Sequence, residues 1–270
     1  MKYLLSVIFG SFAILCSAQP TGCKEMGLKG NPRSIRETQY KMNDVNPGLN
    51  EILLTVFTFD KDCRKVSEVT TDLAGEPKSE HSISYDKAGN ILSEKKENTD
   101  VKGLFNVKYK YDGAGKLLRK EVLSGRKVMA TYIYAYDERG NLSVLDIQKK
   151  SQLLDIFDEK FEYQHDSDNR LTEEVHRDGK DYKKTVFAYN EKNQLSGKVE
   201  YNQKGYVTYK YEYEYDDYGN VSIETADFRG DRINSYSFIY EYDEHGNWIN
   251  KRSLADNKTY SLQIRIFSYD

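Results

Sequence analysis

Apolar and polar side chains alternate along most of this chain. In YKYEYEYD, residues 209–216, a tyrosine at every second position is separated from the next by Lys210, Glu212 or Glu214. YSFIYEYD, residues 236–243, alternates in the same way. A period of two is typical of a β-strand with one aromatic face and one solvated face. Segments such as 117–122 (LLRKEV) and 142–147 (LSVLDI) predict a second strand after each such run, and helix patterns are nearly absent.

This strand–turn–strand unit recurs through the chain. Clear copies of Tyr-Asp-x-x-Gly begin at Tyr85, Tyr111, Tyr136, Tyr215 and Tyr242, and weaker copies begin at Phe59, His165 and Tyr189. These anchors, with Tyr269 after them, lie 24 to 29 residues apart. MGLKGNP, from Met26, keeps its Gly-Asn in the same phase. The pattern predicts tandem β-hairpin repeats with a period of about 26 residues over 26–270.

Each copy also has the chemistry of a hairpin turn. Aspartate at the first turn position accepts hydrogen bonds from the backbone ahead of it, and the fourth position requires a positive φ. Six of nine copies have Gly at this fourth position, two have Asn169 and Asn193, and only Cys63 departs from the pattern. We therefore assign a structural role to the turn residues Asp86, Gly89, Asp112, Gly115, Asp137, Gly140, Asp216, Gly219, Asp243 and Gly246.

The YDxxGN motif at this spacing resembles the YD repeat of the Rhs family, which includes teneurin shells and the cocoon-forming subunits of insecticidal toxin complexes. The resemblance covers roughly residues 26–270 and implies hairpins aligned side by side in a sheet that spirals. Because the repeats run to the end and prolines are few, the chain is similar to small stand-alone secreted members. We expect neither encapsulation of a toxin nor self-cleavage.

The predicted fold is all-β, with about 18 strands. Open twisted sheets of more than about 10 strands tend to curl. We therefore expect a long, twisted, curled antiparallel sheet, a partial shell or spiral, whose tyrosine and phenylalanine faces meet or line a concave interior.

The N-terminus has the pattern of a secretory signal peptide. Lys2 precedes a short apolar run, and Ser17 and Ala18 are small residues at a suitable cleavage point. We expect a signal peptide at 1–18, a lead at 19–25, and a secreted, periplasmic or cell-envelope protein without a membrane span after cleavage. A lipoprotein anchor on Cys16 is the alternative.

Charge and cysteine content limit the possible partners. Forty basic residues against 43 acidic ones give no reason to expect nucleic acid as a partner. The mature chain would keep Cys23 and Cys63, which form either one disulfide or two free thiols in an oxidising compartment. The oligomeric state is not predicted.

Candidate catalytic and metal-binding groups are few. The four histidines, His81, His165, His176 and His245, have no metal-ligand spacing, and the segment 166–170 (DSDNR) lacks the later residues of a calcium loop. Glu244 and His245 fill turn positions that vary freely between copies. The sequence therefore predicts no metal, no cofactor and no enzymatic activity.

The tyrosines are the remaining candidates for binding. With 38% hydrophobic residues, the chain has little else to bury, so most rings are expected to form the core. Tyr206, Tyr218 and Trp248 are the candidates for contact with a ligand at the mouth of a cavity. The predicted function is a non-catalytic scaffold or binding module that recognises a glycan or an envelope protein. The alternative is a component of an Rhs-like toxin-delivery or interbacterial competition system.

Overall fold

The computed structural model describes residues 22–24, 26–43, 46–98, 103–150, 158–179, 181–230 and 232–269. Within these ranges the regular structure is entirely β-strand. No helical segment there has the length and apolarity needed to cross a membrane. The predicted signal peptide, Cys16 and most of the predicted lead lie outside the described residues.

Eighteen strands follow one another along the chain as consecutive hairpins, which confirms the prediction of an all-β protein built from antiparallel hairpin repeats. Their bounds are β1 Ser34–Asn43, β2 Asn46–Phe59, β3 Lys65–Thr71, β4 Pro77–Tyr85, β5 Ile91–Asn98, β6 Gly103–Tyr111, β7 Leu117–Ser124, β8 Lys127–Tyr136, β9 Leu142–Lys149, β10 Glu159–His165, β11 Leu171–Asp178, β12 Asp181–Tyr189, β13 Leu195–Asn202, β14 Val207–Tyr215, β15 Val221–Phe228, β16 Arg232–Tyr242, β17 Trp248–Ala255 and β18 Lys258–Ser268.

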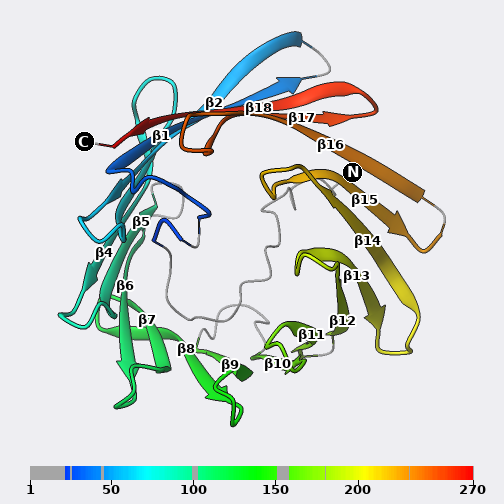
Figure 1. Cartoon of the computed structure of the whole chain (residues 1–270). Coiled ribbons are helices and arrows are strands. Elements are labelled where there is room, and N and C mark those ends of the chain that lie inside the picture. The colour runs from blue at the N-terminus through cyan, green and yellow to red at the C-terminus, as the bar shows by residue number, and fades with distance from the viewer. Residues whose placement is uncertain are drawn as a thin grey trace.

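The sheet closes on itself, so the predicted open spiral is wrong. Each strand pairs with the next, and β1 pairs with both β2 and β18 (Figure 1). The closing ladder runs antiparallel from Ser34 opposite Ser268 to Lys41 opposite Ser261. Over this many strands, twist and coiling bring the first and last strands together, and closure removes the two unpaired edges that an open sheet would expose.

The hairpin turns follow the geometry expected from the repeat. In the copy that begins at Tyr85, Asp86 Oδ1 accepts hydrogen bonds from the N–H groups of Ala88 at 2.8 Å and Asn90 at 2.9 Å. All nine fourth positions have a positive φ, including the non-glycine residue Cys63 at 58°. The return turns at Asp72 and Asn202 have the same hydrogen bonds, although the repeat did not identify them.

The ring has two faces, of which the face that carries the alternating tyrosines is the more buried. We call it the tyrosine face. In β14, Tyr211, Tyr213 and Tyr215 are half-buried, whereas Glu212 and Glu214 between them are exposed. Side chains converge on the concave side of a curved sheet and spread apart on the convex side. The tyrosine face is therefore the inner face.

The ionisable groups agree with this assignment. Burial lowers the pKa of Lys120, Lys251 and Arg265, whose strand positions place them beside rings of the tyrosine face. On the opposite face, ion pairs with neighbouring glutamates raise the pKa of Lys184 and Lys210 instead. Solvation is thus poorer on the inner face than on the outer face.

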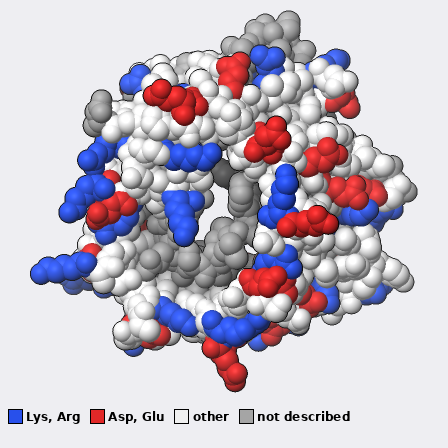
Figure 2. Space-filling view, in the orientation of Figure 1, with Lys and Arg blue, Asp and Glu red and all other residues white. Residues whose placement is uncertain are grey.

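The interior is too wide for opposite walls to pack together. Eighteen strands about 4.8 Å apart, with a tilt of roughly 40°, give a backbone radius of roughly 18 Å. The aromatic rings therefore line the inside rather than meet across it. On the face shown in Figure 2, acidic and basic side chains are interspersed, and the surface is hollowed at the middle of the ring.

Candidate functional site

The three ligand residues proposed from the sequence do not form one site. Tyr206 lies in the return turn before β14, and Tyr218 lies in the turn after β14. A strand of nine residues separates the two turns by about 30 Å, so the two tyrosine side chains lie at opposite rims of the closed sheet. Tyr206 is 66% exposed and Tyr218 is 55% exposed.

Tyr218 has one ring face covered. Its ring stacks on that of Tyr242 with 3.8 Å between centroids and 15° between planes, and the Lys29 ammonium lies 5.7 Å from the Tyr218 centroid. Tyr218 fills one of the two variable turn positions of its repeat. It therefore packs on the anchor tyrosine of the next repeat.

Trp248 is held in a stack of cationic and acidic side chains. The Arg265 guanidinium lies 3.6 Å from the centroid of the indole, and Arg265 Nε donates to Glu37 Oε2 at 2.7 Å. Arg265 and Glu37 are largely buried. Because Trp248, Arg265 and Glu37 come from β17, β18 and β1, the indole helps to join the last strands to the first. The structure thus gives Trp248 a packing role at this junction, where most other repeats have Ile, Leu or Val.

The hydroxyl groups of the anchor tyrosines join neighbouring repeats, which sequence reasoning missed. In five copies this hydroxyl donates to a main-chain carbonyl of the preceding repeat at 2.7 to 2.9 Å. The donors are Tyr85, Tyr111, Tyr136, Tyr189 and Tyr215, and the acceptors are the carbonyls of Lys65, Ile91, Leu117, Leu171 and Leu195. The sequence contained one signal for these hydrogen bonds: the anchor position repeatedly has tyrosine, although phenylalanine would be sufficient for burial.

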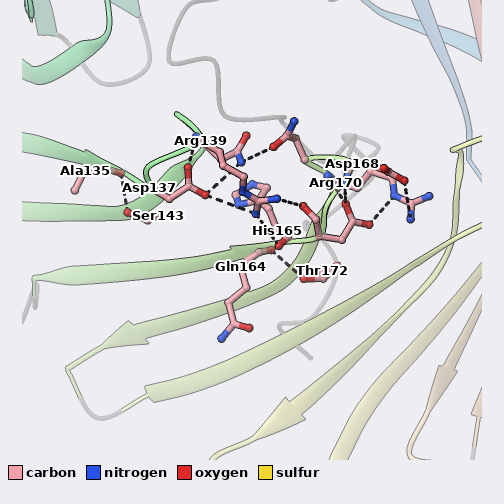
Figure 3. Close-up of polar contacts among 12 residues, drawn as sticks. Ala135, Asp137, Arg139, Ser143, Gln164, His165, Asp168, Arg170 and Thr172 are labelled. Carbon is pink, nitrogen blue, oxygen red and sulfur yellow. Dashed lines mark hydrogen bonds and ion pairs between the residues drawn. The ribbon is translucent and has the colours of Figure 1, made fainter.

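Side chains of the turns also connect one repeat to the next along the rim. Arg139 reaches from the turn after β8 to the carbonyls of Asp166 at 2.6 Å and His165 at 3.1 Å (Figure 3). Asn141 Nδ2 donates to Asn169 Oδ1 at 2.9 Å in the same pair of turns. The conspicuous polar residues of the motif are therefore used to hold turns to one another.

Two acid–histidine contacts lie on the inner wall. Glu94 is buried and accepts hydrogen bonds from His81 Nε2, at 2.8 Å, and from the Tyr109 hydroxyl. Burial alone would raise the pKa of Glu94, but these hydrogen bonds outweigh it and lower the pKa to about 2. His176 contacts Glu159 at 3.0 Å, and its ring stacks on Phe161 with 4.1 Å between centroids. Both acid–histidine pairs therefore already have partners among the neighbouring side chains of the inner face.

Two other inner-face carboxyl groups have a different character. Burial raises the pKa of Glu224, against the opposite effect of the ammonium groups of Lys198 and Lys251. Burial likewise raises the pKa of Glu174. Lys198 lies 4.3 Å from the centroid of Tyr211, and Glu224 is opposite Tyr213 in the sheet. Here ionisable groups and aromatic rings share a poorly solvated surface.

Metal-binding groups do not assemble in the described ranges. No group of three or more His, Cys, Asp or Glu side chains is placed to hold a metal ion there. In the segment 166–170, which has only part of a calcium-loop pattern, Asp166 accepts hydrogen bonds from its own turn and pairs with Arg170 Nε at 2.7 Å. The pKa of Asp166 is low, chiefly because of the N–H of Arg170.

A shallow groove of about 510 Å³ lies over β9 to β12, away from the aromatic wall around Glu224. Its lining includes Val175, Arg177 and Tyr182. The Arg177 guanidinium packs over the Tyr182 ring and pairs with Glu162, which also lines the groove. Glu173, the other carboxylate of the lining, pairs with Lys184. The charged groups of the groove are thus already paired, and the inner tyrosine face is the stronger candidate site.

Comparisons with known proteins give structural similarity only. No family model matches the chain, and no curated protein matches it. A crystal structure of TcdB2-TccC3-Cdc42 is 16% identical with a TM-score of 0.40, covering 84% of this chain and 14% of that chain. A second, TcdB2-TccC3 without its hypervariable C-terminal region, is 14% identical with a TM-score of 0.39, covering 86% and 16%. This chain thus spans about one-seventh of the length of these chains. A porin-like protein from Bacteroides uniformis is 6% identical with a TM-score of 0.47, covering 89% and 99%.

Proposed function

We propose that this protein is a non-catalytic, secreted or envelope-associated binding protein that holds a carbohydrate chain against its inner tyrosine face. The observation that carries the proposal is the inner wall itself, where rows of aromatic rings alternate with poorly solvated carboxyl and ammonium groups. Apolar faces combined with a few placed polar groups are typical of small-molecule sites.

The rings form regular rows. Successive rings on a strand have centroids about 6 Å apart and nearly parallel planes, as for Tyr209 and Tyr211 at 5.8 Å and 23°, and for Phe161 and Tyr163 at 6.3 Å and 7°. Sugar rings present C–H groups that pack flat on aromatic faces. One face of Phe161 is covered by His176, and the Lys198 ammonium lies over Tyr211, so a linear chain of sugar units would pack on the ring surfaces that these contacts leave open.

The polar groups of the inner face can form hydrogen bonds with the hydroxyl groups of a sugar. Glu174 and Glu224 are acceptors, and Lys198 and Lys251 are donors, within the same part of the wall. Ionisable groups whose pKa is shifted by burial concentrate at functional sites. A bound sugar would provide these groups with hydrogen-bond partners that the wall supplies only in part.

Titration of single variants tests the proposal. The mature protein would be screened on a glycan array, and the retained oligosaccharide would then be titrated against Tyr211→Leu, Glu224→Gln and Tyr206→Ala. We expect the two inner-face variants to raise Kd at least tenfold, and the rim variant Tyr206→Ala to leave it unchanged. Loss of binding in Tyr206→Ala alone, or no retained glycan, would contradict the proposal.

The alternative suggested by the repeat resemblance is a role in toxin delivery, which requires a protein partner. Crosslinking of the mature protein in intact cells separates the two functions. Recovery of a toxin or immunity protein, with no glycan retained on the array, would favour the alternative.

A further inference from the structure

One repeat of the ring is divided between the two ends of the chain. Every other motif turn joins consecutive strands, whereas β18 and β1 are not joined through a turn and are held together by noncovalent contacts. Tyr269 follows β18 as the anchor of a ninth repeat. Gly30, with φ of 74°, fills the fourth turn position of that repeat, and the buried residue Pro32 follows it before β1. We call this divided repeat, with the β1–β18 ladder, the seam.

The two halves make the contacts of a continuous repeat. The Tyr269 hydroxyl donates to Asp243 Oδ2 and accepts from Asn247 Nδ2 at 2.8 Å. One repeat earlier, the Tyr242 hydroxyl makes the same two contacts with Asp216 and Asn220. The seam therefore reproduces the geometry of its neighbour without a covalent turn.

A short N-terminal segment, residues 22–24 and 26–31, spans the gap, and we call it the hook. On the C-terminal side, the Lys29 N–H donates to Asn247 Oδ1 at 2.8 Å, and Asn247 Nδ2 donates to the Lys29 carbonyl at 2.9 Å. The His245 ring lies so close to Gly30 that a Cβ there would be 2.5 Å from the imidazole Cδ2. With its φ of 74°, this position favours glycine, and any larger residue would have to displace the imidazole.

On the other side, the hook is attached to the turn between β2 and β3. Cys23 forms a disulfide with Cys63, and the Cys23 N–H donates to the Cys63 carbonyl at 2.9 Å. Cys63 is the one residue that departs from Gly or Asn at the fourth turn position, and the disulfide explains the departure. The hook is thus bonded covalently to the N-terminal side of the seam and only by weak contacts to the C-terminal side.

A compact hydrophobic cluster lies at the same place. Its buried members are Cys23, Ile35, Phe59 and Cys63, with Met26, Leu28, Phe57 and Phe267 packed against them. It combines residues of the hook with residues of β1, β2 and β18. The hook therefore packs against both the first and the last strands, next to the β1–β18 ladder.

We propose that the seam is a redox-sensitive gate, in which the Cys23–Cys63 disulfide holds the hook in place and its reduction lets β1 separate from β18. The reductant is a dithiol. Because both cysteines are buried, its thiolate attacks one sulfur when the hook moves away locally, and its second thiol then resolves the mixed disulfide. Two electrons pass to the protein, so that Cys23 and Cys63 become thiols. The reductant is released with its two thiols oxidised to a disulfide. Opening exposes the inner face, and this inference does not depend on whether that face binds a glycan.

Hydrogen–deuterium exchange of the mature protein tests the gate. The variant Cys23→Ser/Cys63→Gly removes the disulfide and restores the glycine that other repeats have in the turn, so the turn itself is preserved. We expect amides of β1 and β18 to exchange at least tenfold faster in this variant and after reduction of the native protein by dithiothreitol. Amides of β6 to β8 should not change. Equal acceleration throughout the ring, or acceleration confined to the hook, would overturn the proposal.

A matched pair of variants that both keep Cys23 and Cys63 provides a second test. Asn247→Ala removes the contacts of the hook with the seam, whereas Asn220→Ala removes the equivalent side chain one repeat earlier. Under reducing conditions, Asn247→Ala should add further acceleration in β1 and β18, and Asn220→Ala should not. The same effect from both variants would show that the seam is not a distinct opening point.

Discussion

At the residue scale, the fourth position of each motif turn has a strict steric requirement. Gly140 has φ of 89°, a region that β-branched residues rarely adopt. Asn169 and Asn193 fill the same position with φ near 60°, and asparagine tolerates this conformation better than most residues. The pattern of Gly and Asn in the repeat therefore reflects backbone geometry.

We expect Gly140→Val to lower the free energy of unfolding by about 1–3 kcal/mol, because it forces a β-branched residue to positive φ. Urea denaturation measures this change. Gly113→Val is the matched control, because Gly113 has no positive φ and a Cβ there would contact nothing. Equal losses in the two variants would contradict the turn assignment.

Glu94 gives a prediction for pH dependence. Its folded pKa of about 2 lies below its ordinary value of 4.5. A carboxyl with a depressed folded pKa stabilises the fold above the unfolded pKa, and this stabilisation is lost as pH falls toward the folded pKa. Glu94→Gln should therefore lower stability at pH 7, by at most about 3 kcal/mol, and reduce the loss between pH 4.5 and 2. Urea midpoints across this pH range measure the effect. Glu138→Gln, at an exposed turn position, should leave the profile unchanged; if it had the same effect, the assignment to Glu94 would be wrong.

At the scale of the hairpin, the anchor tyrosine connects one repeat to the one before it. The hydroxyl of Tyr136 donates to the Leu117 carbonyl at 2.8 Å, while its ring faces the Lys116 ammonium. Because each repeat contacts chiefly its neighbours, such links are the units from which the stability of the array is built.

Tyr136→Phe should cost about 0.5–1.5 kcal/mol, the usual contribution of one hydrogen bond. Tyr132→Phe, on the same strand, is the control, because Tyr132 donates no hydrogen bond to the described part of the chain. Thermal or urea unfolding of both variants provides the comparison. A loss as large for Tyr132→Phe as for Tyr136→Phe would show that the hydroxyl of the anchor has no special role.

The turns were predictable because their requirements are local. A positive φ and an Asx hydrogen bond are satisfied within five residues, so Asp86 and Gly89 could be assigned from the repeat alone. The acceptor of the Tyr136 hydroxyl is a main-chain carbonyl 19 residues away, and a carbonyl has no sequence signature. The separation of Tyr206 from Tyr218 could have been deduced, because return turns and motif turns lie at opposite ends of the strands.

At the scale of the molecule, closure depends on the twist accumulated over all the strands. The repeat phase shows Tyr269 and Gly30 as parts of incomplete copies, but no local pattern shows that they complete each other. Closure also changes how the aromatic side chains are placed. In a closed sheet with a radius of roughly 18 Å, the aromatic side chains line the inner wall. In an open sheet, they would have had to be buried against one another.

The distance between β1 and β18 tests the closed ring most directly. Spin labels at Arg36→Cys and Ile266→Cys, which are opposite each other in the closing ladder, would be measured by double electron–electron resonance with the native disulfide intact. A closed ring predicts a single short distance, below about 20 Å. In an open sheet, 17 strand spacings of about 4.8 Å would place the labels up to roughly 80 Å apart. A broad or long distance distribution would contradict the closed ring.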